Sequence, residues 1–138
     1  MSITFPESHR DLLEQPVVVT LTTVSAEGEP YSVAVWRRWD GQHLLITSDA
    51  GTRKHRNAMA NPKVAVLALD PNNSQRYLSI RGVVEALDTT DVTAELDRQT
   101  QLYTGAPHYF GRFEPVENEA TFTGVVLRIR PTRFVTYG

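Results

Sequence analysis

Residues 47–70 read TSDAGTRKHRNAMANPKVAVLALD and hold, in order, a strand end, a basic turn, a short helix and a second strand. The helix is predicted over residues 52–60, because the Asn61-Pro62 pair that follows biases the chain away from helical geometry. Residues 64–69 (VAVLAL) form a nearly continuous apolar run, which is typical of a strand buried inside a β-barrel. This order predicts a short helix between two strands of a β-rich domain.

The start of this helix has the composition of a phosphate-binding site. Three hydroxyl residues and three basic residues lie in it or just before it: Thr47, Ser48, Thr52, Arg53, Lys54 and Arg56. The first turn of a helix also has unpaired N–H groups and the positive end of the helix dipole, both of which favour a bound anion. The single glycine, Gly51, does not make a P-loop. From these residues alone, an ordinary basic helix start on a solvated surface is an equally good interpretation.

Length and composition predict one globular domain over residues 1–138, which is small for a domain that encloses a large cofactor, so we expect a second subunit to complete the site. The net charge of −2 argues against a protein that binds nucleic acid or an anionic membrane over a whole basic face. Because the chain has no cysteine, disulfides and zinc–thiolate sites are excluded. A polar N-terminus and no long apolar run predict a cytoplasmic protein without a membrane span.

The strand pattern predicts a small split β-barrel, mainly β (α+β), with six to seven antiparallel strands and two to three helices. Residues 17–25 and 31–39 are expected to form a hairpin, with residues 43–48 as the third strand of a meander. Later strands are expected over three further ranges: 76–87 with a bend at Gly82, 122–130, and 133–137.

A helix after residue 90 is predicted to pack on the barrel mouth. Its apolar stripe holds Val92, Leu96 and Tyr103, and its polar stripe includes Glu95. Residues 104–118 (TGAPHYFGRFEPVEN) combine glycine, proline and aromatic residues, which favours a functional loop that lines the substrate side.

Three segments in this order give the chain a resemblance to the pyridoxamine 5′-phosphate oxidase-like split β-barrel family. They are EGEPYSVAVW (27–36), TSDAGTRKHRNAMANPKVAV (47–66) and RYLSIRGVVEAL (76–87). The resemblance covers about residues 14–137 and implies a homodimer with a flavin-type cofactor at the subunit interface. It implies the following cofactor-binding residues: Thr52, Arg53 and Lys54 on the phosphate, Thr47 and Ser48 beside the cofactor, Trp36 and Arg38 from the neighbouring strand, Asn57 from the helix, and Tyr77 approaching the cofactor of the other subunit.

Two departures from the family pattern argue against vitamin B6 oxidation. Val33 stands where the oxidases of the family have an arginine on the FMN phosphate, and no Arg- and Trp-bearing tail follows Tyr109. The short length, the segment YTG at 103–105 and the terminal RPTRFVTYG resemble the coenzyme F420 (deazaflavin) branch of the same superfamily. The resemblance therefore implies an oxidoreductase that transfers a hydride from reduced F420 to a conjugated small molecule, with FMN as the alternative cofactor.

The deazaflavin itself carries the hydride, so the chain needs no nucleophile and no metal. The four histidines show no metal-ligand spacing, and each is expected to be a surface or packing residue. His108, in the aromatic loop, is the one weak candidate for a catalytic proton donor. Two other functions stay open: a flavin or F420 carrier without turnover, and a nucleic-acid-binding barrel that uses the aromatic and basic residues 36–39.

Overall fold

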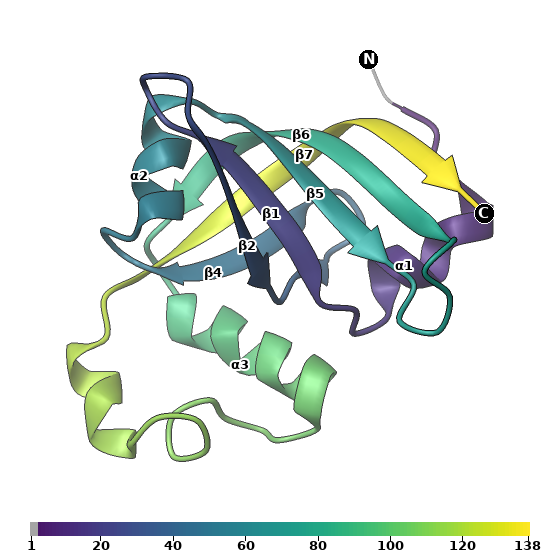
Figure 1. Cartoon of the computed structure of the whole chain (residues 1–138). Coiled ribbons are helices and arrows are strands. Elements are labelled where there is room, and N and C mark those ends of the chain that lie inside the picture. The colour runs from purple at the N-terminus through teal and green to yellow at the C-terminus, as the bar shows by residue number, and fades with distance from the viewer. Residues whose placement is uncertain (1–2) are drawn as a thin grey trace.

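The computed structural model describes residues 3–138, which form one sheet with three α-helices and two 3-10 helices among them (Figure 1). In chain order the elements are η1 (Glu7–His9), α1 (Arg10–Glu14), β1 (Val19–Val24), β2 (Pro30–Val35), β3 (Arg38–Trp39), β4 (Leu44–Asp49), α2 (Arg53–Ala60), β5 (Lys63–Leu69), β6 (Tyr77–Asp88), α3 (Val92–Thr104), η2 (Val116–Thr121) and β7 (Gly124–Tyr137).

Seven antiparallel strands lie in the order β2-β1-β5-β6-β7-β4-β3. Strands β2 and β3 are at opposite edges of this sheet, yet only residues 36 and 37 separate them in the chain. Three Cα steps of about 3.6 Å each span at most about 11 Å, so the two edges must lie close together. The sheet therefore curls into a half-barrel, which confirms the predicted split β-barrel.

The expected meander is confirmed at both of its turns, but its middle strand is interrupted. β1 pairs with β2 over six residues and β3 pairs with β4, while the other edge of β4 pairs with β7. The predicted strand over residues 31–39 is interrupted because the backbone N–H of Arg37 donates to the hydroxyl of Tyr103 (3.0 Å) and not to a neighbouring strand. This interruption lets one segment serve both edges of the sheet.

The interior of the half-barrel is filled by alternate residues of β1, β4, β5, β6 and β7, and α1 closes one end with Leu12 and Leu13. The prediction that residues 64–69 are buried is only half right. Val64, Val66 and Ala68 face the core, whereas Leu67 and Leu69 point outward and are 40% and 44% exposed. The strand is buried on one face only because the convex face of the sheet has no layer packed over β5 within residues 3–138.

Gly82 lies at a break in the β6–β7 register, as the predicted bend required. A Cβ atom at this position would be 2.6 Å from Cγ2 of Ile129 and 3.1 Å from the carbonyl oxygen of Arg130. We therefore expect Gly82→Ala to lower the free energy of unfolding by about 1–3 kcal/mol, the usual cost of overpacking. Urea denaturation checks this, with Arg81→Ala on the exposed side of the same strand as control; equal losses in both variants would contradict it.

Candidate functional site

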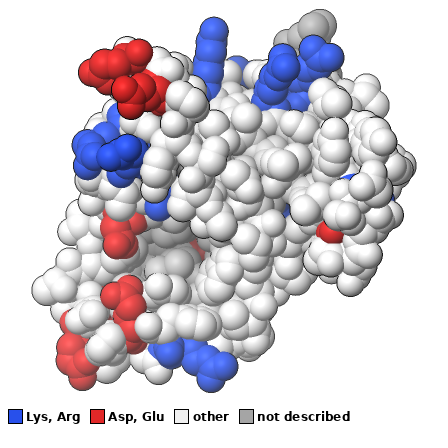
Figure 2. All heavy atoms as spheres, viewed as in Figure 1, with Lys and Arg blue, Asp and Glu red and all other residues white. Residues whose placement is uncertain are grey.

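A cavity of about 350 Å³ opens between β2, β4, the start of α2, and α3 with the loop that follows it. Its lining includes Trp36, Thr47, Lys54, Gln99, Tyr109 and Phe113. Figure 2 shows a hollow on this side of the molecule, below the strands and above α3. The hydrophobic lining with a few convergent polar groups is typical of a small-molecule site. We call this cavity the α3 pocket.

Aromatic side chains form one wall of the α3 pocket. The indole of Trp36 stacks on Tyr103, with ring centres 5.0 Å apart and an angle of 12°, and meets Phe113 edge-on at 5.8 Å. The hydroxyl of Tyr103 accepts from the N–H of Arg37 and donates to the carbonyl of Val17 (2.7 Å), which fixes the ring that supports Trp36. Flat aromatic faces of this kind suit a planar ligand. Trp39, in contrast, packs against the core.

Arg37 anchors the same corner from inside the protein. Its side chain is fully buried, and Nη2 donates to the carbonyls of Leu12 (2.8 Å) and Gln15 (2.6 Å) at the end of α1. Burial lowers the pKa of this guanidinium, which faces carbonyl groups in place of a carboxylate. The residue thus ties α1 to the crossover between β2 and β3 that carries Trp36.

Lys54 is the charged residue of the α3 pocket. It is the second residue of α2 and is half-buried, and this burial lowers the pKa of its ammonium group, partly opposed by the charge of Asp49. Within residues 3–138, no carboxylate lies within ion-pairing distance of Lys54. A desolvated ammonium without an acidic partner gains most from a bound anion.

The remaining residues of the basic turn build the start of α2. The hydroxyls of Ser48 and Thr52 lie 2.7 Å apart, and both are within hydrogen-bonding distance of the carbonyl of Asp49. One hydroxyl can donate to this carbonyl while the other donates to its neighbouring hydroxyl, which closes the turn. Thr52 is the residue before the helix, and it makes no side-chain cap to the first N–H groups of α2. These N–H groups therefore keep their capacity to bind an anion beside Lys54.

Arg53 and Asn57 lie near the pocket without lining it. The guanidinium of Arg53 sits over the ring of Tyr31 on β2, 5.3 Å from its centre. The amide of Asn57 is buried and donates to the hydroxyl of Thr23 (3.0 Å), which fastens α2 to β1. Asn57 thus holds the helix in place, and Arg53 packs on β2.

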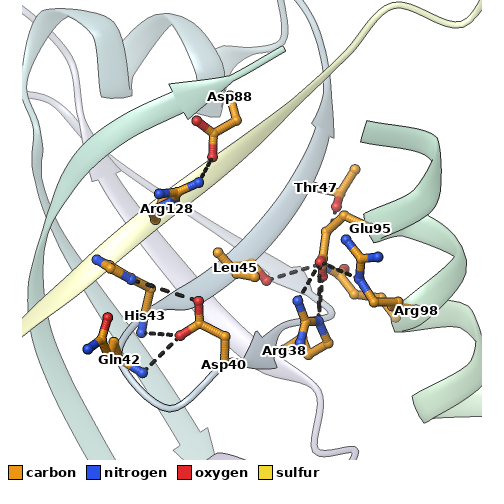
Figure 3. Close-up of polar contacts among 11 residues, drawn as sticks. Arg38, Asp40, Gln42, His43, Leu45, Thr47, Asp88, Glu95, Arg98 and Arg128 are labelled. Carbon is orange, nitrogen blue, oxygen red and sulfur yellow. Dashed lines mark hydrogen bonds and ion pairs between the residues drawn. The ribbon is translucent and has the colours of Figure 1, made fainter. Parts of the chain in front are cut away.

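Arg38 is not brought to the α3 pocket. Its guanidinium makes a bidentate bond with Glu95 at 2.7 and 2.9 Å, and it lines a separate charged cavity of about 320 Å³ with Asp88 and Arg128 (Figure 3). The predicted placement of Glu95 on the solvated stripe of the helix is wrong. Glu95 is 3% exposed, because Arg38 from β3 and Arg98 from α3 both converge on its carboxylate.

Tyr77 and His108 also lie away from the α3 pocket. Tyr77 is on the outer face of β6, where it stacks on Tyr137 at 5.4 Å. His108 is largely exposed and pairs with the carboxylate of Asp97 at 3.1 Å. Tyr77 could therefore contact a cofactor only in a pocket of another copy of the chain. The predicted role of Tyr77 likewise places it beside the cofactor of the other subunit.

Two residues that sequence reasoning did not single out do line the α3 pocket. Gln99 falls on the same stripe of α3 as Val92, Leu96 and Tyr103, and a polar side chain on an apolar stripe is the signal that marks it. Tyr109 lies in the aromatic loop that was predicted to line the substrate side. Burial raises the pKa of its hydroxyl, so this group stays protonated and can donate at neutral pH.

The part of the chain that the structure describes contains no helix that is both long and apolar enough to cross a membrane. Among residues 3–138, no three or more His, Cys, Asp or Glu side chains converge as metal ligands.

Comparison with known proteins identifies the family. Residues 5–136 match the family model described as pyridoxamine 5′-phosphate oxidase. The pyridoxine/pyridoxamine 5′-phosphate oxidases of Yersinia enterocolitica and Escherichia fergusonii are 28% and 26% identical over 81 residues, which is 58% of this chain and 37% of each enzyme. The chain thus aligns with well under half the length of these curated relatives.

Solved structures share the fold over almost the whole chain. An F420 reductase is 36% identical, with a TM-score of 0.81 and coverage of 95% of this chain and 98% of that one. The heme storage protein HutZ from Vibrio cholerae, at 15% identity and a TM-score of 0.68, covers 99% of this chain and 96% of that one and shows the fold alone. As its three motifs indicated, the chain belongs to the pyridoxamine 5′-phosphate oxidase family and is similar over nearly its full length to an F420 reductase.

Proposed function

We propose that the α3 pocket binds coenzyme F420 and that the protein is an F420-dependent oxidoreductase that reduces a conjugated small molecule. One observation carries this: Trp36, Thr47 and Lys54, which come from three separate parts of the chain, line one hydrophobic cavity. All three are residues for which the family resemblance implies contact with the cofactor. The similarity to a protein named F420 reductase supports the choice of cofactor.

The groups present fit such a ligand. Trp36 and Phe113 offer flat apolar faces to a ring system, while Lys54 and the uncapped start of α2 offer positive charge and N–H donors to its phosphate. Bound reduced F420 supplies the hydride for the reaction. The chain positions the ring, excludes water through its aromatic wall, and offers the Tyr109 hydroxyl as a donor beside the acceptor substrate.

FMN is the second candidate ligand, favoured by the names of the curated relatives. Val33, at the position where the family resemblance expects an arginine on the FMN phosphate, packs against the core and offers no charge. This observation supports F420 over FMN.

A homodimer is the proposed assembly, because the α3 pocket continues onto an apolar outer face. Val18 lines the pocket and is 54% exposed. The β1–β5 register pairs Val19 with Ala68, so Val18 lies next to Leu69 on the face that also exposes Leu67 and Val135. Figure 2 shows a broad area of this side without charged side chains. A second copy on this face would cover the open side of the pocket.

The test is a titration of F420 and of FMN into the purified protein, followed by anaerobic mixing of reduced F420 with a quinone or an enone. We expect tight binding of F420, weak binding of FMN, and oxidation of reduced F420 only when protein and acceptor are both present. A yellow preparation that retains FMN would favour the alternative cofactor. Binding without turnover would indicate a carrier, and salt-sensitive binding of single-stranded oligonucleotide without either cofactor would overturn the proposal.

A further inference from the structure

Gln99 is held in one orientation at the floor of the α3 pocket. Its side chain is 1% exposed, and its amide nitrogen Nε2 lies within hydrogen-bonding distance of three acceptors. These are the carbonyl oxygen of Leu45 (3.1 Å), the hydroxyl of Thr47 (3.2 Å) and the carboxylate of Glu95 (3.1 Å). Each belongs to β4 or to the preceding turn of α3.

The amide of Gln99 cannot rotate to exchange its nitrogen and oxygen. The carbonyl of Leu45 and the carboxylate of Glu95 only accept hydrogen bonds, so a flipped amide would place Oε1 against two acceptors. In the observed orientation no donor within residues 3–138 reaches Oε1. Because Oε1 is not sealed off from the pocket, a ligand there can supply the donor that the chain does not.

Glu95 secures this orientation. Both of its carboxylate oxygens accept from Arg38, and Oε1 also accepts from Arg98 at 3.1 Å (Figure 3). The two guanidinium groups balance the buried charge and fix the carboxylate plane, so Oε2 is aimed at Gln99. The ion pairs in the charged cavity on one side of α3 therefore fix which end of the Gln99 amide faces the pocket on the other side.

We propose that Gln99 is a specificity-determining residue whose Oε1 accepts a hydrogen bond from the imide N–H of a ring in the α3 pocket, with Glu95 as its positioning residue. Thr47 completes the recognition: its hydroxyl accepts from Gln99 Nε2 and keeps its own proton for a ring carbonyl next to the imide. An N–H flanked by carbonyls is common to flavins and deazaflavins. The proposal rests on the proposed function, because it requires the ring to enter this pocket.

The experiment compares ligands with and without the imide proton in matched variants. F420 and FMN, each with its N3-methyl derivative, are titrated into the wild-type protein, into Gln99→Met, and into Gln101→Met as an exposed control on the same helix. We expect the wild type and Gln101→Met to prefer the N3–H ligand about tenfold, the effect of one net hydrogen bond of about 1.4 kcal/mol. In Gln99→Met, which keeps the side-chain volume, the preference should fall to about twofold or less.

A third variant and a spectroscopic measurement on the wild type test the proposal further. Glu95→Gln offers an amide that can pair with either end of Gln99, so it should lower the preference for the N3–H ligand as well. In the wild type, the imide proton of bound isotope-labelled ring should resonate downfield of the free ring, and this readout does not depend on any variant folding. An unshifted imide proton, or an equal preference in the wild type and Gln99→Met, overturns the role of Gln99. If the wild type binds none of the four ligands, the proposed function itself fails.

Discussion

Replacing Lys54 with alanine is expected to weaken binding of F420 and of FMN at least tenfold, or about 1.4 kcal/mol, without unfolding the protein. The ammonium group is half-buried in the α3 pocket and has no acidic partner among residues 3–138, so an anionic ligand supplies the attraction that the folded chain lacks. Because burial disfavours its charge, the free energy of unfolding should change by less than about 1 kcal/mol on removal of the side chain.

Fluorescence titration of both cofactors measures the loss, and thermal unfolding checks the fold. Arg56→Ala is the matched control, since Arg56 lies on the same helix with the same charge but is exposed and donates to the carbonyl of Gly51. We expect the control to bind F420 nearly as well as the wild type. Equal losses in the two variants would mean that general positive charge attracts the ligand, and unchanged binding in both would remove the phosphate site.

The same residue should give the binding a pH dependence. Burial lowers the pKa of Lys54 below its ordinary 10.5, so the charged form that holds a phosphate is fully present below that lowered pKa and is lost as the pH rises through it. Affinity should therefore decline at a lower pH in the wild type than in Lys54→Arg, whose guanidinium stays charged. The ring imide also loses its proton in alkaline solution, so the measurement is the difference between the affinity–pH curves of the wild type and Lys54→Arg. If the two curves superimpose, titration of Lys54 does not control binding.

Local patterns in the sequence were sufficient for the elements around Lys54. The β-branched strands and the Asn-Pro pair after α2 predicted the first hairpin and α2, because each depends on residues close in the chain. The order of the three family motifs predicted the split β-barrel. Trp36, Thr47 and Lys54 were also chosen from sequence, and the structure brings them to one pocket. That they bind a cofactor stays a prediction.

The errors came from contacts between residues far apart in the chain. The strand at 31–39 breaks because Tyr103, on α3, takes the N–H of Arg37, and no local pattern records such a bond. Glu95 looked solvated because its neighbours on the helix are charged, but an arginine from β3 buries it. The role of Gln99 could not be predicted for the same reason, because the acceptors on β4 that orient its amide become its neighbours only after folding.

Replacing Leu67 with glutamate is expected to separate the proposed homodimer and to weaken cofactor binding with it. Leu67 lies at the centre of the outer face of β5, between Thr20 of β1 and Ser79 of β6, and Val135 follows on β7. Leu69, Tyr77 and Tyr137 form the neighbouring row, which ends beside Val18 at the mouth of the α3 pocket. A carboxylate buried in such an interface without a partner costs several kcal/mol, so dimer affinity should fall at least about a hundredfold.

Sedimentation velocity over a range of concentrations measures the assembly, and F420 titration of the same samples measures the site. Met59→Glu is the control, because Met59 is a comparably exposed apolar residue on α2 and not on the sheet. If the second copy covers the pocket, Leu67→Glu should be monomeric and bind F420 less tightly, while Met59→Glu keeps both properties. If Leu67→Glu is monomeric and its F420 affinity is unchanged, the whole site lies within one chain. If the wild type is itself monomeric, the apolar face does not bind a second copy. Neither result rejects cofactor binding in the α3 pocket.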